Sequence, residues 1–299
     1  MAISTLFFVH HKDFLYLYPA NLLKVACMTL KNISVNCEYQ AATIGWYLAQ
    51  GNSSVAGHRH YPALSGQSAR NNVNKKMEEI LDFYLRLSQN NNKPWFDAHR
   101  AEYEAVKKKL AVIAGEFIHG VEQFDPRCQN LQVKDCTYRI NRDIRFSSDK
   151  RPYKDWHGIY VCPKGKKSGM AGYYIHFEPA SDLYFVCGGL YNPTKEVLQS
   201  IREQIMLEPD EFHDAVLSCG EGFHLNWDNA LKRMPVGYNE ADRHSEYYRL
   251  RTFEMYKPLT RQEVLDKDFL KYALSSLERC YGFNELLNKC FDYAYDSDK

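Results

Sequence analysis

The chain has 299 residues, with 38 Lys and Arg against 37 Asp and Glu, and its formal net charge is +1. A charge this close to zero argues against a surface-wide field that binds polyanions, so any anion site must be local. The charges are unevenly divided, because residues 1–76 hold seven of the cations and two of the acids, which leaves 31 cations and 35 acids for the rest. No stretch approaches the roughly 20 apolar residues of a membrane span, so we expect none.

The first part of the chain shows neither a sustained helical period nor an alternating one. We therefore expect a poorly patterned extension over residues 1–76, either disordered or the product of a start codon assigned too early, and a single domain over residues 77–299. The apolar run Leu6–Val9 has no cation before it, which disfavours a secretory signal. The competing interpretation is a weak membrane or partner anchor formed by Phe7, Phe8, Phe14, Leu15 and Tyr16.

Nine cysteines are scattered along the chain, and no two of them form a Cys-x-x-Cys pair. Without an export signal, this usage predicts reduced and mostly buried thiols in a cytoplasmic protein. A reactive thiolate needs a cationic neighbour, and Cys136 and Cys162 come closest to that condition. The spacing predicts no zinc ribbon, and no pattern identifies a cofactor or a resident metal.

Two helices are expected at the start of the domain, because apolar residues recur at helical spacing over Glu78–Ser88 and again over Asp97–Val121. The polar run Gln89–Asn92 ends the first helix. Pro94 suits the first turn of the next, where its missing N–H would be unpaired in any case. The aromatic pair directly after it more often packs into a core than binds a ligand.

From Lys134 the apolar period changes to two, which predicts a strand with one buried face. Its apolar positions are Cys136, Tyr138, Ile140, Ile144 and Phe146. Similar runs follow at Gly158–Cys162, Gly172–Glu178 and Leu183–Leu190, and their links are too short for parallel crossovers. Tyr247–Met255 is a candidate fifth strand.

Helices are expected again after Asn192-Pro193 and after Thr260–Glu263, which reads as a capping box. Strands grouped between helices indicate an α+β fold. We therefore predict an antiparallel four- to five-stranded meander flanked by N-terminal and C-terminal helices.

Several blocks, in order from about Met77 to the C-terminus, resemble a single family. The densest block runs from Arg139 to Lys154 and reads Arg-Ile-x-Arg-Asp-Ile-Arg-Phe-Ser-x-Asp-Lys-x-Pro-Tyr-Lys. The others are Asn91–Phe96, Gly172–Pro179 with Gly188–Pro193, and Leu231–Tyr238 with Lys257–Thr260. Together they resemble the signature of domain-of-unknown-function family 2461, a group of conserved hypothetical proteins, and the resemblance implies no particular activity.

The densest block crowds six cations into 16 residues: Arg139, Arg142, Arg145, Lys150, Arg151 and Lys154. On a strand, alternation puts Arg139 and Arg145 on the polar face. Arg142 would share the apolar face, so it needs an acid partner or a place where the sheet ends. Guanidiniums on one strand face suit a phosphate or carboxylate, which they can hold in forked hydrogen bonds. The alternative is a solvated face with weak ion pairs.

Three functions remain open. The first is binding of a phosphorylated or other anionic ligand, such as a nucleotide, by Arg139, Arg142, Arg145, Lys150, Tyr153 and Lys154. The interleaved aromatics would also suit single-stranded nucleic acid, although the chain's charge favours that partner less. The second is a hydrolase or transferase in the same pocket, with His176, Glu178 and Asp143 for proton transfer. The third is a protein–protein interaction module with no small-molecule site. Cofactor and oligomeric state do not follow from the sequence.

Overall fold

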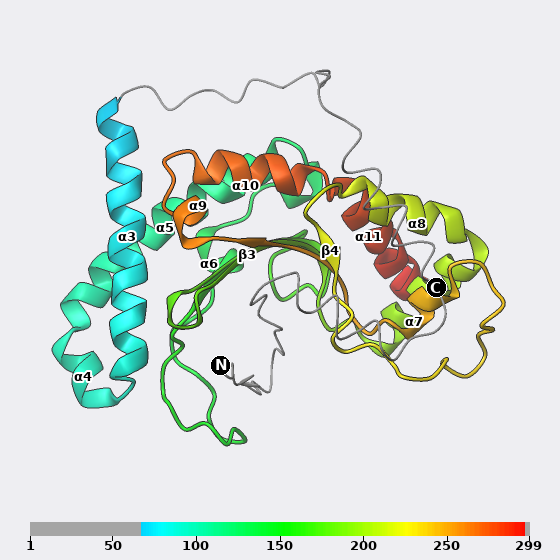
Figure 1. Cartoon of the computed structure of the whole chain (residues 1–299), viewed down its shortest axis with the longest axis horizontal. Coiled ribbons are helices and arrows are strands. Elements are labelled where there is room, and N and C mark those ends of the chain that lie inside the picture. Colours follow the sequence, from blue (N-terminus) through cyan, green and yellow to red (C-terminus); the bar gives the residue numbers. More distant parts are fainter. Residues whose placement is uncertain (1–66, 297–299) are drawn as a thin grey trace, which may run out of the picture. The chain divides into compact units, whose positions relative to one another are not determined.

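A five-stranded antiparallel sheet with helices before and after it forms the described part of the chain (Figure 1). The computed structural model describes the backbone of residues 67–296 and the side chains of residues 75–296. All of these lie in the second of two units into which the chain divides, residues 63–299. This arrangement confirms the predicted α+β class. The predicted extension, residues 1–76, lies almost wholly outside the described residues.

The predicted N-terminal helices are present, and the first of them begins earlier than predicted. They are α3 (Gln67–Gln89), α4 (Lys93–Ala98) and α5 (Arg100–Glu122). Asn92 caps α4, because its side chain accepts the backbone N–H of Trp95 at 3.0 Å, and Pro94 occupies the first turn. Phe96 is buried, as its position at a helix start predicted. The end of α3 and the start of α4 therefore lie where the polar and proline signals placed them, whereas α3 begins at Gln67, before the predicted start at Glu78 and within the predicted extension.

The sheet has the strand order β1-β2-β3-β5-β4, and every neighbouring pair is antiparallel. The strands are β1 (His157–Val161), β2 (Gly172–Glu178), β3 (Leu183–Leu190), β4 (His224–Leu225) and β5 (Phe253–Leu259). Three of the predicted strands are confirmed as β1, β2 and β3. The candidate fifth strand was placed too early, because the 3-10 helix η3 (Ser245–Arg249) occupies its first half and pairing begins at Phe253.

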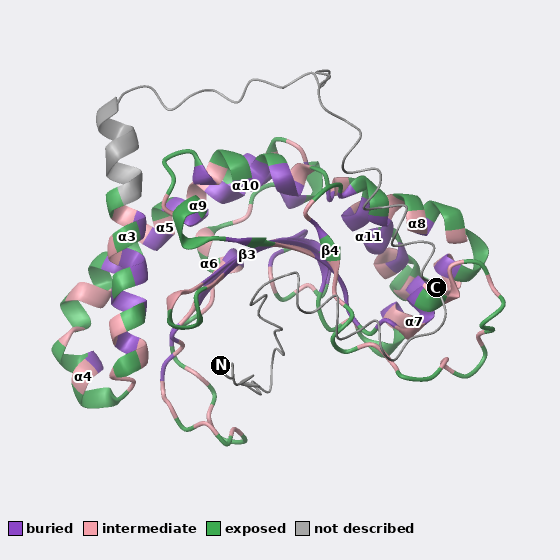
Figure 2. Cartoon of the chain, in the orientation of Figure 1, coloured by how far each residue is buried: buried purple, intermediate pink, exposed green. Residues whose placement is uncertain are grey.

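One face of the sheet forms the core with the helices. Tyr173, Ile175 and Phe177 of β2 are fully buried on this face. Phe177 meets Phe269 of α10 (Phe269–Glu278) with ring centroids 5.9 Å apart, and Asn284 of α11 (Tyr281–Asp296) donates to the carbonyl of Gly172 at 3.0 Å. Figure 1 places α5, α10 and α11 together on this side, and Figure 2 shows their buried residues turned toward the sheet.

The remaining helices are short or lie at one end of the sheet. They are α6 (Val133–Cys136), α7 (Lys195–Leu207), α8 (Pro209–Ser218) and α9 (Arg261–Val264), with the 3-10 turns η1 (Pro126–Cys128) and η2 (Pro179–Ser181). The capping box before α9 is confirmed, since Thr260 and Glu263 bond each other's backbone N–H groups. The N-cap of α7 is Thr194, the residue directly after the predicted pair Asn192-Pro193. None of the described helices combines the length and the apolar composition that crossing a bilayer requires.

Close strand pairing depends on one glycine in particular. Gly189 has a φ of +134°, and a Cβ there would stand 2.0 Å from the carbonyl oxygen of Phe253 on the neighbouring strand. Only glycine tolerates both the backbone angle and the contact. The Gly188-Gly189 block singled out in the sequence therefore serves the β3–β5 pairing.

We propose that the domain folds without the extension, because the buried core described here begins at Met77. A chain that starts at Met77, the first residue of this core, is expected to show a single cooperative urea transition with a midpoint close to that of the full chain. Far-UV circular dichroism and tryptophan fluorescence should report the same transition. Loss of cooperativity in the shorter chain would contradict this domain boundary.

Candidate functional site

The cation-rich block forms an irregular hairpin at the edge of the sheet, which we call the basic loop and define as residues 137–156. Only two isolated bridges tie it together and to β1, Thr137 with Ile159 and Asn141 with Tyr153. Between the two bridges one side of the hairpin advances by four residues, from Thr137 to Asn141, while the other advances by six, from Tyr153 to Ile159. Because the two sides differ in length, a regular antiparallel ladder cannot run between the bridges. The predicted strand over residues 134–146 is therefore wrong. Phe146, predicted to be buried, is 91% exposed.

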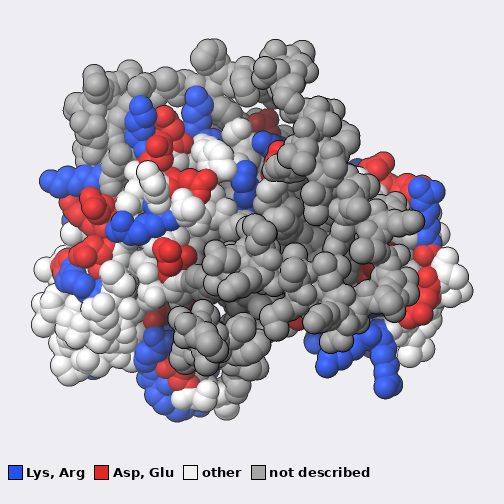
Figure 3. Space-filling model, in the orientation of Figure 1, with Lys and Arg blue, Asp and Glu red and all other residues white. Residues whose placement is uncertain are grey.

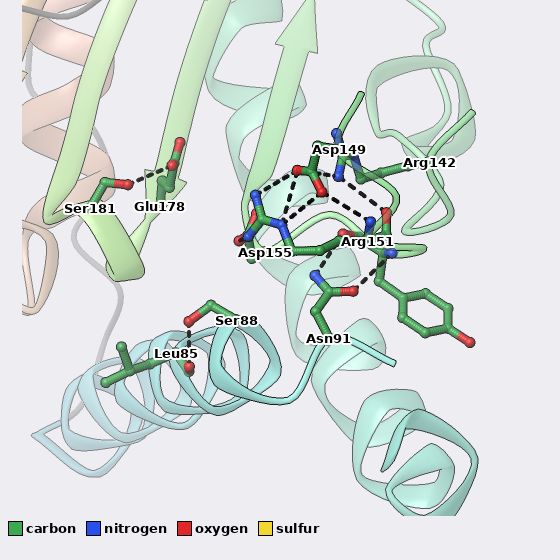
Figure 4. A network of polar contacts seen from close by, with 10 residues as sticks. Leu85, Ser88, Asn91, Arg142, Asp149, Arg151, Asp155, Glu178 and Ser181 are labelled. Carbon is green, nitrogen blue, oxygen red and sulfur yellow. Dashed lines mark hydrogen bonds and ion pairs between the residues drawn. The ribbon is translucent and has the colours of Figure 1, made fainter. Parts of the chain in front are cut away.

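Three acids of the loop pair with three of its six cations. Arg142 donates to Asp149 at 2.7 Å and to the carbonyl of Arg151 at 3.1 Å. Arg151 in turn bonds Asp149 at 2.8 Å and Asp155 at 2.5 Å (Figure 4). Hydrogen bonds from Arg151, and then from Arg142, hold the pKa of Asp149 well below its usual value. Arg142 thus has the acid partner that its apolar phase required.

The base of the loop is fixed to the N-terminal helices. Asn91 donates to the carbonyl of Tyr153 at 2.9 Å and accepts its N–H at 3.1 Å (Figure 4). The Tyr153 ring is 5% exposed and stacks on Phe96 with centroids 4.0 Å apart. Tyr153, predicted as a ligand contact, is placed in the core. Two blocks that are some 60 residues apart in sequence, Asn91–Phe96 and the end of the basic loop, form a single structural unit.

The tip of the loop is exposed and also internally paired. Asp143 accepts from Arg145 at 2.6 Å, and side-chain and backbone bonds from Arg145 lower the pKa of Asp143 to about 2. Lys150 donates to the carbonyl of Ile144 at 3.0 Å. Figure 3 shows acidic side chains among the basic ones at the lower left, where this loop lies in Figure 1. The structure therefore separates Arg145 and Asp143 from the sheet.

Three cations of the loop, Arg139, Lys150 and Lys154, form no ion pair among the described side chains, and Lys150 instead donates to a backbone carbonyl at the tip. Lys154 is half-buried, and its ammonium lies 4.9 Å from the ring centroid of Trp156 and 5.1 Å from that of Tyr138. Burial lowers the pKa of Lys154, and the charges of Arg139 and Arg142 lower it further. We call the group of Lys154, Arg139, Tyr138 and Trp156 the Lys154 corner.

The Lys154 corner adjoins the face of the sheet opposite the helices, which we call the aromatic face. Its side chains are those of Tyr160, Tyr174, His176, Phe185 and Tyr256, which the strand pairing brings to one side. Trp156 reaches this face, because its ring lies 5.4 Å from that of His176. The corner and the aromatic face therefore form one continuous surface.

His176 is held on both sides by residues of its own strand. Its Nδ1 lies 2.8 Å from the Tyr174 hydroxyl and its Nε2 lies 3.2 Å from a carboxylate oxygen of Glu178. Ser181 donates to the other oxygen of Glu178 at 2.7 Å (Figure 4), and Phe185 stacks on the His176 ring. The structure thus brings together two of the three predicted catalytic residues, His176 and Glu178. The third, Asp143, lies in the basic loop with Arg145.

A buried carboxyl group on the aromatic face was missed by the sequence interpretation. Glu254 of β5 is 9% exposed, pairs in register with Gly189, and accepts from Asn226 at 3.2 Å. Burial raises the pKa of Glu254 to about 7. The signal was present in the sequence, an acid in an apolar run, but the strand had been placed to end at Met255, so Glu254 fell at its margin.

Neither the cysteines nor the potential metal ligands of the described residues add a reactive group to the site. The seven cysteines of the described part are all buried and unpaired. Burial raises the pKa of Cys136 and of Cys162 to about 12, despite the nearby charge of Lys166. These thiols therefore remain protonated and unreactive at neutral pH. Among the described residues, no group of three or more His, Cys, Asp or Glu side chains is arranged to hold a metal ion.

Replacing Arg142 by alanine is expected to lower the free energy of unfolding by about 2 kcal/mol or more, because Asp149 and the Arg151 carbonyl lose a donor on a side chain only 15% exposed. Arg139→Ala and Arg145→Ala, at exposed positions, serve as controls and should keep the urea midpoint of the wild type. The gap should narrow as pH falls below 3.8, toward the lowered pKa of Asp149, because protonation of Asp149 removes the same interaction. Equal midpoints for the three variants at pH 7 would contradict the assignment.

Glu254→Gln is expected to stabilise the domain in alkaline solution. Because the folded pKa of Glu254 is raised from 4.5 to about 7, ionisation opposes folding progressively as pH rises between these values. The variant should gain up to roughly 3 kcal/mol over the wild type at pH 8 and little at pH 4. Urea unfolding at both pH values tests this, with Glu104→Gln at an exposed position as the control. A gain that is independent of pH would contradict a raised pKa.

Comparison with known proteins identifies a family whose model covers the sequence blocks that form this site. A search of curated proteins and a search of solved structures each found no match. A family model described as conserved hypothetical protein (DUF2461) matches residues 79–285, from α3 to α11. This range covers more than half of the chain and includes the basic loop and all five strands. The chain therefore belongs to the conserved hypothetical protein family DUF2461.

Proposed function

We propose that the protein binds a phosphorylated or otherwise anionic small molecule at the Lys154 corner. The observation that carries the proposal is the state of Lys154, a half-buried ammonium over two rings with no carboxylate partner among the described side chains. Removing a charge from water is costly unless an opposite charge compensates it. An anion from solution would supply that compensation.

The neighbouring cations support the same proposal. Arg139 is exposed and free to turn toward a ligand beside Lys154, and its guanidinium could hold a phosphate or carboxylate through two hydrogen bonds. Arg142, although it contacts Asp149, still contributes to the positive potential that lowers the pKa of Lys154. We assign ligand contact to Lys154 and Arg139, and assign support of the loop to Arg142 and Arg151. Lys150 and Arg145, at the exposed tip, would take part only if the loop changed shape.

Catalysis by His176, Glu178 and Asp143 is the second candidate function. Both ring nitrogens of His176 are engaged, one by Tyr174 and one by Glu178. A proton transfer to or from a ligand would first have to break one of these bonds. Burial also raises the pKa of Tyr174, so its hydroxyl is a poor source of phenolate. These contacts favour ligand binding over hydrolase or transferase chemistry.

An interaction surface is the third candidate, and the tip of the basic loop favours it. Phe146 is 91% exposed, and the guanidinium of Arg145 lies 5.8 Å from its ring centroid. A protein partner that covered Phe146 would remove its apolar ring from water, which favours association. The cytoplasm is the compartment we propose for any of these functions, because the described cysteines are free thiols.

Lys154→Met tests the anion site, because methionine keeps the apolar stem and removes the charge. Isothermal titration of the wild type with inorganic phosphate and with nucleoside monophosphates should show binding that weakens with added salt. The variant should lose about tenfold or more in affinity, the value of a hydrogen bond to a charged group. Arg145→Gln, which removes a paired cation from the same loop, should bind like the wild type.

The pH dependence provides a second check. Since burial lowers the pKa of Lys154 and a bound anion would raise it, binding takes up a proton at high pH. The affinity of the wild type should therefore fall as pH rises through the lowered pKa of Lys154, below its usual 10.5. Lys154→Met should lack this dependence. Equal affinities of Lys154→Met and the wild type for every anion tested would rule out the Lys154 corner as the site.

A further inference from the structure

A hollow lies between α7 and the loop that follows β4. Its volume is 460 Å³, and it is lined by one stripe of α7 from Lys195 to Met206 and by Val236–Tyr238 of the loop. This loop contains the Leu231–Tyr238 block singled out in the sequence. Gly237 has a φ of +93°, which lets the loop turn at the mouth of the hollow. Figure 3 shows basic side chains gathered at the lower right, over this loop.

Arg202 supplies a positive charge to the wall of the hollow. Its Nε donates to the carbonyl of Tyr248 at 2.9 Å and its Nη2 to that of Leu250 at 3.2 Å. A guanidinium has five N–H groups, so three are left for a ligand. No carboxylate pairs with Arg202 among the described side chains, and its guanidinium carbon lies 6.0 Å from the ring centroid of Tyr238.

The rest of the lining has both charged and apolar parts. Lys195 adds a second cation, whereas Glu203 is bonded to Gln199 at 2.9 Å and opposes an anion. Met206 and Val236 are exposed apolar side chains at the same hollow. A ligand that fits must therefore carry one negative group for Arg202 and a flat or apolar part for the Tyr238 side.

We propose that this hollow is a second binding site, for a small organic anion that joins a carboxylate or phosphate group to a flat ring. The anionic group meets Arg202 and Lys195, and the ring lies against Tyr238. This site is independent of the Lys154 corner, because the two share no residue and lie on different elements. Carboxylate and phosphate satisfy the same guanidinium, so the test includes both.

The probes are phenyl phosphate, benzoate, inorganic phosphate and benzyl alcohol, which carry the ring and the charge together or separately. Binding to the full chain is measured by isothermal titration and by the NMR shifts of the Gly237 amide and the Arg202 Nε–H group. We expect phenyl phosphate or benzoate to bind and to move both signals. Inorganic phosphate and benzyl alcohol should each bind at least about tenfold more weakly. The tighter of the two ring anions identifies the preferred acid group.

Charge variants of opposite sign on α7 make the test specific, and neither removes the loop contacts of Arg202. Lys195→Gln should weaken binding about fivefold and Glu203→Gln should tighten it by about the same factor, the effect of one charge at close range in water. Lys154→Met should leave this binding unchanged, which separates the two sites. No shift at Gly237 with any probe, or identical affinities for the two α7 variants, would overturn the proposal.

Discussion

Asp149 holds the basic loop together, because it accepts hydrogen bonds from both Arg142 and Arg151. Guanidiniums brought this close repel each other, and a partly buried one without an acid partner would cost several kcal/mol, on the order of the price of an uncompensated buried charge. With Asp149 in place the chain can reverse between Arg142 and Arg151. This reversal sets Tyr153 against Phe96 and leaves Lys154 next to the aromatic face.

The ion pairs of the basic loop also show that a high density of cations in the sequence does not by itself indicate a strongly positive site. Six cations in one block predicted a site of high positive charge, but Asp143, Asp149 and Asp155 neutralise much of it within the loop. What matters for the proposed binding is the charge that has no carboxylate partner. Since Lys150 bonds the carbonyl of Ile144 at the exposed tip, the remaining candidates are Lys154 and Arg139. Lys154 is the more informative of the two, since it is half-buried and its pKa is lowered by its surroundings.

Local signals in the sequence were sufficient for most elements. The helical stripes of α3 and α5, the capping box at Thr260, and the alternation in β1, β2 and β3 all act within a few residues, so the pattern alone predicts them. His176 and Glu178 share a face because they lie two residues apart on a single strand. The alternating pattern gave a wrong prediction at the basic loop, where the bonds of Arg142 to Asp149 and to the carbonyl of Arg151 compete with strand pairing. Phe146 occupies an apolar position of that alternating pattern only by coincidence, because its side chain is exposed.

The parts of the site that the sequence could not predict depend on contacts between distant segments. Asn91 and Tyr153 meet across 62 positions, and no local pattern contains that contact. The contact of Lys154 with Tyr138 lies within the basic loop, but it depends on the irregular turn that the sequence interpretation read as a strand. Arg142 and Lys154 face the same physical problem, a cation partly withdrawn from water, and the fold solves it for Arg142 with Asp149. An anion bound at the Lys154 corner would do for Lys154 what Asp149 does for Arg142, which is why the missing partner there argues for a ligand.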